Sequence, residues 1–281
     1  MKISRVKSLL TAIILVASTG SAESQTPALA PAPTYADLAD LALPAQVVAH
    51  VRVASAARLK PAEAPGLAAG RTRFYVQADV ISLIRGPGEM AARVSYLVDL
   101  PNDADGKAPK LRKKEERLIF AASVPGRPGE LRLLAPDAQI AAVPADAERL
   151  RAILREAAGA RAAPRITGIG KAFHVPGSLP GESETQIFLL TAENRPVSLS
   201  IVRRPGQAPR WAVALSEIVD ESAAAPARNS LLWYRLACGL PRTLPPQSLA
   251  DADRNDAGAI RADYGLVLNQ LGGCPRNRIR R

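Results

Sequence analysis

Histidine, cysteine and aromatic residues are scarce in this chain of 281 residues. It contains two His, two Cys, two Trp, five Tyr and four Phe. The small number of His and Cys residues excludes a multi-ligand zinc site, an iron–sulfur cluster and a disulfide-dense scaffold built from them. They are His50, His174, Cys238 and Cys274. We therefore expect no metal and no cofactor.

Long apolar runs are also lacking, and the first 22 residues have the order of a secretory signal peptide. Three basic residues precede an apolar stretch at residues 9–16, and small residues follow at 20–22. The stretch is shorter than the roughly 20 residues of a membrane-spanning helix. We expect cleavage after Ala22, a Pro/Ala-rich linker at residues 23–34, and a periplasmic or secreted protein without a transmembrane segment.

The formal net charge of +11 lies mostly at the two ends of the chain. Residues 2–7 supply three positive charges, and a predicted basic tail at residues 276–281 supplies four. A further basic run at residues 107–114 is followed by two Glu and has no interleaved aromatic residue to stack on a base. This run is typical of a solvated loop, so we expect no nucleic-acid partner.

An oxidising compartment makes a lone pair of cysteines a probable structural disulfide. Cys238 and Cys274 allow one pairing, and neither has a Lys, a His or a second Cys close in sequence that would activate a thiolate. We therefore predict a Cys238–Cys274 bridge that pins a C-terminal helix to its domain.

Residues 35–159 are predicted to form a domain of five strands and a closing helix. Apolar residues recur with period two from residue 35 to about residue 124, as in strands with one buried face. From Leu150 they recur at i, i+3, i+4 and i+7, which indicates a helix that Gly159 can end in the left-handed conformation.

Residues 160–275 are predicted to form a second domain, an antiparallel meander followed by helices. Compact turns with Pro, Gly and Asn join the strand-like segments. These segments are residues 165–175, 185–192, 197–203 and 210–219. A terminal helix should end at Gly272. The fold class is thus mainly β with α.

Residues 74–100 carry a likeness to a known architecture. The strand from Phe74 runs into Arg85-Gly86-Pro87-Gly88, and a second strand follows from Arg93. Residues 35–158 resemble the OB-type barrels of netrin-like and metalloproteinase-inhibitor-like modules, which implies a five-stranded barrel with a packed helix. Those modules usually begin with a Cys and carry several disulfides, whereas residues 35–158 have no Cys, so an inhibitory function does not follow.

The sharpest catalytic hypothesis pairs His174 with Ser178 or Ser183, because a neutral imidazole can take a hydroxyl proton. The segment around Ser183 lacks the final Gly of a G-x-S-x-G turn, and Pro and Gly around Ser178 indicate a loop. No phosphate-binding glycine loop is present.

We therefore expect an exported, non-enzymatic binding or structural module of the cell envelope, with another envelope protein as its partner and an oligomeric state left open. The alternative is a secreted hydrolase that uses His174 with one of the two serines. A carbohydrate-binding module ranks third, because aromatic residues are few.

Overall fold

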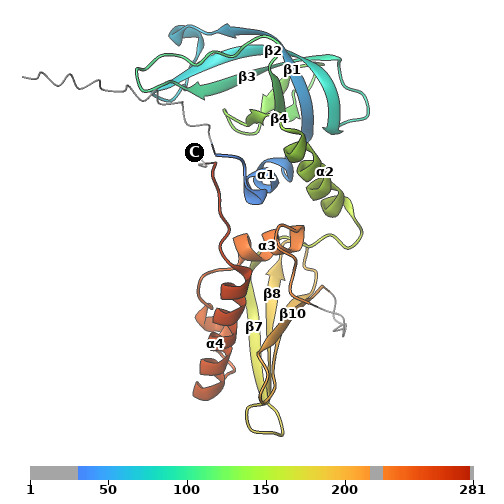
Figure 1. Ribbon diagram of the computed structural model, residues 1–281, viewed down its shortest axis with the longest axis vertical. Coiled ribbons are helices and arrows are strands. Elements are labelled where there is room, and N and C mark those ends of the chain that lie inside the picture. Colours follow the sequence, from blue (N-terminus) through green and yellow to red (C-terminus); the bar gives the residue numbers. More distant parts are fainter. Residues whose placement is uncertain (1–30, 216–223, 279–281) are drawn as a thin grey trace, which may run out of the picture. The chain divides into compact units, whose positions relative to one another are not determined.

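The computed structural model describes residues 31–215 and 224–278 (Figure 1). The predicted signal peptide, most of the predicted linker, the end of the predicted strand at 210–219 and the last three residues of the basic tail lie outside these ranges. No helix within them has both the length and the hydrophobicity that crossing a membrane requires. The fold is mixed, with mostly antiparallel sheets and helices, as the sequence predicts.

The described chain begins with a helix, α1 (Tyr35–Ala42), where period-two strands were predicted. That prediction was wrong because a capping box starts a helix here: Asp37 N donates to the Thr34 hydroxyl, and Thr34 N donates to the Asp37 carboxylate. The helix buries Leu38 and Leu41 in the first hydrophobic core. The two leucines are three residues apart, which is a helical spacing.

The first sheet, sheet A, has the strand order β3-β2-β1-β4-β5, and β6 also pairs with β4. Its strands are β1 (Val47–Arg58), β2 (Arg71–Arg85), β3 (Arg93–Pro101), β4 (Glu116–Ser123), β5 (Leu131–Leu133) and β6 (Gln139–Ala141), with a short 3-10 helix, η1 (Pro61–Glu63), between β1 and β2. A lone parallel bridge, Ser95–Glu130, links β3 to the segment that leads into β5. Sheet A is therefore not closed by a continuous ladder.

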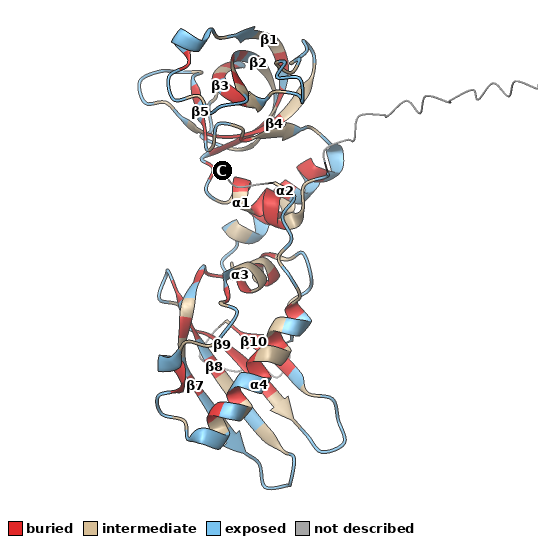
Figure 2. Cartoon of the chain, turned by 90° about the vertical axis from the view of Figure 1, so that its left-hand side faces the viewer, coloured by how far each residue is buried: buried red, intermediate tan, exposed pale blue. Residues whose placement is uncertain are grey.

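The helix α2 (Pro144–Ala158) packs against sheet A, as predicted from its apolar stripe. Leu150 and Ile153 are fully buried in the same core as the inward residues of the strands. Figure 2 shows the buried part of α2 in red. Pro144 stands at the first helical position, where its missing N–H costs nothing. Gly159 has φ −70°, so the left-handed cap predicted for it is wrong; the backbone leaves the helix in an extended conformation instead.

The second sheet, sheet B, is the predicted antiparallel meander, in the order β10-β9-β8-β7. Its strands are β7 (Ile166–Pro176), β8 (Ser183–Thr191), β9 (Val197–Arg203) and β10 (Arg210–Ala214). The helices α3 (Leu231–Gly239) and α4 (Arg254–Leu271) and the 3-10 helix η2 (Pro246–Leu249) share a second core with it. Gly272 has φ +71° where α4 ends, as expected of a glycine at this position.

Candidate functional site

A groove with a volume of about 700 Å³ opens on sheet A beside β3 and β5. One side comes from β2 and β3, and the other from β5 and the segments on either side of it. Backbone bonds close it at two points, since Ser95 N donates to Gly129 O at 2.8 Å and Asp99 N donates to Pro136 O at 2.7 Å. The groove thus lies along an edge of β3 that is incompletely paired with β5.

The alternation of β2 and β3 determines which side chains reach the groove. Phe74 and Val76 point into the core, so Tyr75 between them points outward, where it pairs with Leu97 of β3. Tyr75 is 40% exposed, Leu97 45% and Leu134, on the opposite wall, 39%. The floor therefore presents large apolar side chains at positions that usually carry polar residues in a sheet with one solvated face.

A paired charge forms one end of the groove. Arg73 donates from Nε to Asp99 Oδ1 at 2.7 Å and from its terminal nitrogen to Oδ2 at 2.8 Å, a bidentate pair in which Asp99 is buried. This hydrogen bonding raises the pKa of Arg73 above its ordinary value. Burial also raises the pKa of Tyr96, whose hydroxyl donates to Gln139. Arg73 is thus positively charged, and the carboxylate of Asp99 already balances its charge.

The rim of the groove carries two further arginines, Arg127 and Arg132, which differ in their ion pairing. Arg127 forms an exposed ion pair with Glu130 at 3.2 Å. Arg132, the exposed middle residue of β5, has no carboxylate partner anywhere in residues 31–215 and 224–278. Since Arg73 and Arg127 are both paired, Arg132 leaves the groove with one uncompensated positive charge.

The C-terminal strap, residues 274–278, is tied to the segment that continues from the groove wall. Arg278 donates to Asp137 at 2.6 Å, and Arg71 reaches the other oxygen of that carboxylate at 3.4 Å. Asp137 follows Pro136, whose carbonyl binds β3. The start of the predicted basic tail is therefore anchored to acidic side chains.

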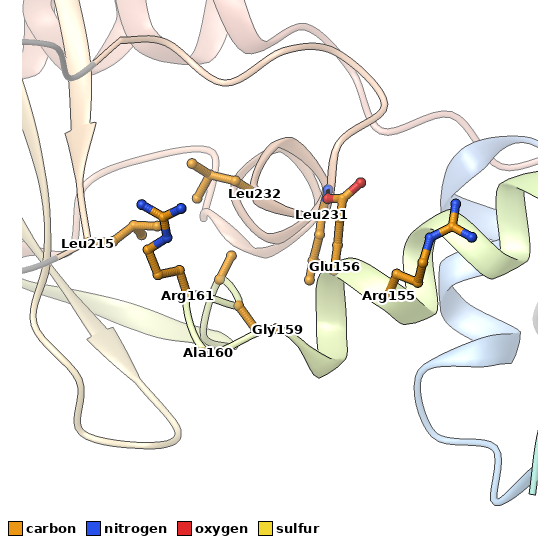
Figure 3. Close-up of a pocket in the computed structure, with 10 residues that line it drawn as sticks. Arg155, Glu156, Gly159, Ala160, Arg161, Leu215, Leu231 and Leu232 are labelled. Carbon is orange, nitrogen blue, oxygen red and sulfur yellow. Dashed lines mark hydrogen bonds between the residues drawn. The ribbon is translucent and has the colours of Figure 1, made fainter.

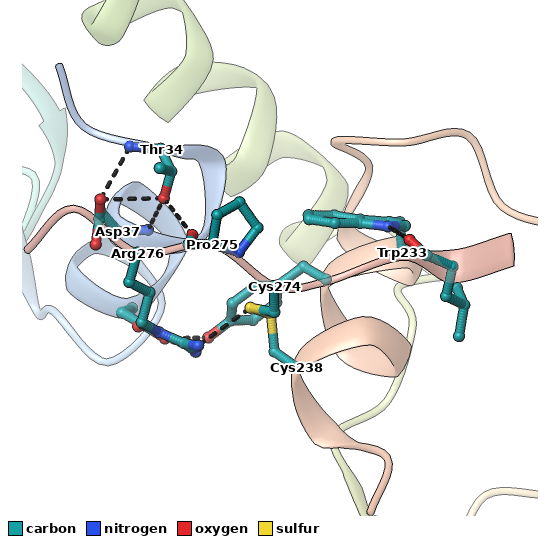
Figure 4. Close-up of a disulfide and its surroundings, with 10 residues drawn as sticks. Thr34, Asp37, Trp233, Cys238, Cys274, Pro275 and Arg276 are labelled. Atoms are coloured by element: carbon teal, nitrogen blue, oxygen red, sulfur yellow. Dashed lines mark hydrogen bonds and ion pairs between the residues drawn. A yellow bond between two sulfur atoms is a disulfide. The ribbon is translucent and has the colours of Figure 1, made fainter. Parts of the chain in front are cut away.

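The strap is held at its other end by the predicted disulfide, which the structure confirms between Cys238 of α3 and Cys274 (Figure 4). Beyond it, Arg276 pairs with Asp40 at 2.6 Å. The carboxylate of Asp37 accepts the backbone N–H groups of the next two strap residues, at 2.9 and 3.1 Å. The disulfide thus stands directly before the strap residues that contact α1.

A second pocket, of about 500 Å³, is lined by the end of α2 and the start of α3 (Figure 3). Leu231 N donates to the Glu156 carboxylate at 2.7 Å, so the positive end of α3 already holds an anion from the chain itself. Arg155 and Arg161 lie on either side of Glu156 in Figure 3. This arrangement explains how α2 and α3 are joined, and we assign no ligand to it.

The structure places His174 beside a threonine. Its Nδ1 lies 2.8 Å from the Thr185 hydroxyl, which donates to the buried Asp263 carboxylate. Ser183 pairs with Pro176 at the end of β7, and Ser178 lies in the turn between β7 and β8. Among the residues described, no hydrogen bond joins His174 to either serine.

Thr185 cannot replace the serines as a nucleophile, because it is fully buried and its proton is committed to Asp263. Arg203 binds the other oxygen of that carboxylate, with its Nε at 2.7 Å. The four groups tie α4 to three strands of sheet B. Their geometry therefore fits a structural network. No three His, Cys, Asp or Glu side chains of the described chain gather closely enough to hold a metal ion.

The groove residues were not among the candidates from the sequence. The alternation already placed Tyr75 and Leu97 on the outward face, and a large apolar residue at the outward position of two strands was the available signal. The Gly-Pro-Gly turn at residues 86–88 favours pairing of these two consecutive strands, but nothing local indicated that Arg132 lines the same groove. No protein-family model matches the chain, and no curated protein matches its sequence.

Proposed function

We propose that the protein is an exported, non-enzymatic binding module of the cell envelope, and that the groove on sheet A is its ligand site. The observation that carries the proposal is the combination of three exposed apolar side chains with one unpaired arginine in a single concavity. Binding sites are concave, largely apolar and equipped with a few polar groups that orient the ligand. The pairing of His174 with a serine receives no support from the hydrogen bonds of that region.

We also infer that sheet A is a partly open barrel of the OB type. Its strand order, together with the parallel bridge between Ser95 and Glu130, supports this inference. OB barrels are five-stranded and partly open, and their second and third strands face the ligand. The floor of the groove comes from β2 and β3. The absence of a Cys from residues 35–158 still argues against a metalloproteinase inhibitor.

Export predicts a defined mature N-terminus. Protein recovered from the periplasm of a bacterial host should begin at Glu23, because residues 1–22 have the order of a cleavable signal peptide. N-terminal sequencing measures this directly. Intact Met1 in a cytoplasmic fraction would contradict the proposal.

The ligand site is tested by methyl NMR, with leucine methyl groups as reporters. We expect a peptide, an oligosaccharide or an oligonucleotide probe to shift the methyl signals of Leu97 and Leu134, because these side chains line the groove. The signals of Leu179, exposed in the turn between β7 and β8, and of Leu190, exposed on β8, should not move. Leu97→Ser should abolish the shifts, whereas the control Leu190→Ser should keep them.

Melting temperatures of the two variants show whether both remain folded. Shifts of equal size at the control methyl groups, or binding that survives Leu97→Ser, would contradict a ligand site in the groove.

A further inference from the structure

The chemistry of the groove distinguishes between classes of ligand. Among the described residues, the uncompensated positive charge of the groove comes from Arg132, because Asp99 and Glu130 already pair with the neighbouring arginines. A ligand that complements the groove therefore carries an anionic group. One unpaired arginine matches one carboxylate, in contrast to the many cations that a nucleic-acid backbone needs.

The floor argues further against bases and sugars. Tyr75 is the single exposed aromatic residue of the groove, since Tyr96 is only 2% exposed. The bases of single-stranded nucleic acids stack on a succession of aromatic rings, and a single ring does not provide such a surface. Leu97 and Leu134 beside Tyr75 instead form a surface that fits an aliphatic or aromatic side chain.

The incompletely paired edge of β3 suits an extended chain. The edge is bonded at Ser95 and at Asp99, and its bridge with Glu130 does not extend into a ladder. Ser95 to Asp99 spans roughly 13 Å at the rise of a strand, which is the length of about four to five residues. An extended peptide presents alternate side chains to such a surface.

We propose that the groove binds an extended peptide segment that carries a carboxylate two residues away from an apolar side chain, so that both side chains project from the same face. Arg132 pairs with the carboxylate, and the apolar side chain lies on Tyr75 and Leu97. This inference rests on the proposed function and defines its ligand as an acidic, extended segment of another protein.

The experiment compares three blocked pentapeptides by methyl NMR titration of the full mature protein. Ac-EGLGE-NH2 carries both features on one face, Ac-KGLGK-NH2 reverses the charge, and Ac-EGGGE-NH2 lacks the apolar side chain. We expect the first to bind at least tenfold more tightly than the other two and to shift the Leu97 and Leu134 methyl signals. Arg132→Glu should reverse the preference between the Glu and Lys peptides.

Arg210→Glu is the matched control, because Arg210 is an exposed strand arginine of sheet B without an ion pair in the described chain. It changes the net charge equally and should leave the peptide preference unaltered. Equal affinity for the Glu and Lys peptides, or an equal effect of both arginine variants, would overturn the inference.

Two further probes separate this inference from the proposed function. If maltohexaose or an eight-residue thymidine oligonucleotide shifts the groove methyl signals while Ac-EGLGE-NH2 does not, the groove remains a ligand site and the peptide inference fails. If none of the five probes shifts the Leu97 and Leu134 signals at millimolar concentration, the inference and the proposed function both fail.

Discussion

Asp263→Ala should lower the free energy of unfolding by about 3 kcal/mol, because it leaves a charge and a buried hydroxyl without their partner. Asp263 is 1% exposed and binds both Arg203 and Thr185. The side chain of Arg203 is 36% exposed and can recover some hydration, which places the loss at the lower end of the range for broken buried ion pairs. Urea denaturation followed by circular dichroism measures the change.

The matched control is Asp251→Ala, which removes the ion pair with Lys171. Both partners are more than half exposed, so this change should cost less than about 1 kcal/mol. Thr185→Val tests the hydroxyl alone and should cost less than Asp263→Ala. Equal losses for Asp263→Ala and Asp251→Ala would show that the network contributes no more than a surface ion pair.

Replacing both Cys238 and Cys274 with serine should lower the free energy of unfolding by up to about 4 kcal/mol. The bridge closes a separation of 36 residues. The value of about 4 kcal/mol corresponds to the loop entropy that such a bridge removes from the unfolded chain. Without the bridge, the strap of residues 274–278 is no longer tethered to α3. The contacts of the strap with Asp37 and Asp40 would then have to form without that tether. Denaturation with and without a reductant measures the loss.

Three controls accompany this prediction. Reduced wild type should match the double serine variant, and the reductant should leave that variant unchanged. Unfolded, unreduced wild type should contain no free thiol. Two reactive thiols, or a double variant as stable as the oxidised protein, would contradict a stabilising bridge.

Local patterns predicted much of the fold. The meander of sheet B followed from compact turns between strand-like segments, and the helix over residues 144–158 followed from an apolar period of 3.6. Both signals depend on near neighbours in the chain. The helix α1 was missed because its eight residues are too few to separate the two periods, although Thr34 and Asp37 have the spacing of a capping box. The strand β6 has three residues, which is too short for any period.

The candidate site was less predictable than the fold. His174 could be identified as a titratable side chain, but its network reaches Asp263, which lies 78 residues beyond Thr185. The groove likewise combines side chains of β2 and β3 with Arg132, which is far along the chain. Such neighbours depend on how the elements pack, and a single sequence carries little information about that.

The sequence by itself determined the scarcity of metal ligands, the direction in which each strand side chain points, and the pairing of its two cysteines. The tertiary structure alone decided that Tyr75 and Leu97 line one groove with Arg132, that a lone bridge joins β3 to the segment leading into β5, and that Arg276 and Arg278 bind acidic residues. The physical reason is the distance along the chain over which each feature arises. Alternation arises from the backbone geometry of adjacent residues, whereas a groove and an ion pair arise only when distant segments pack together.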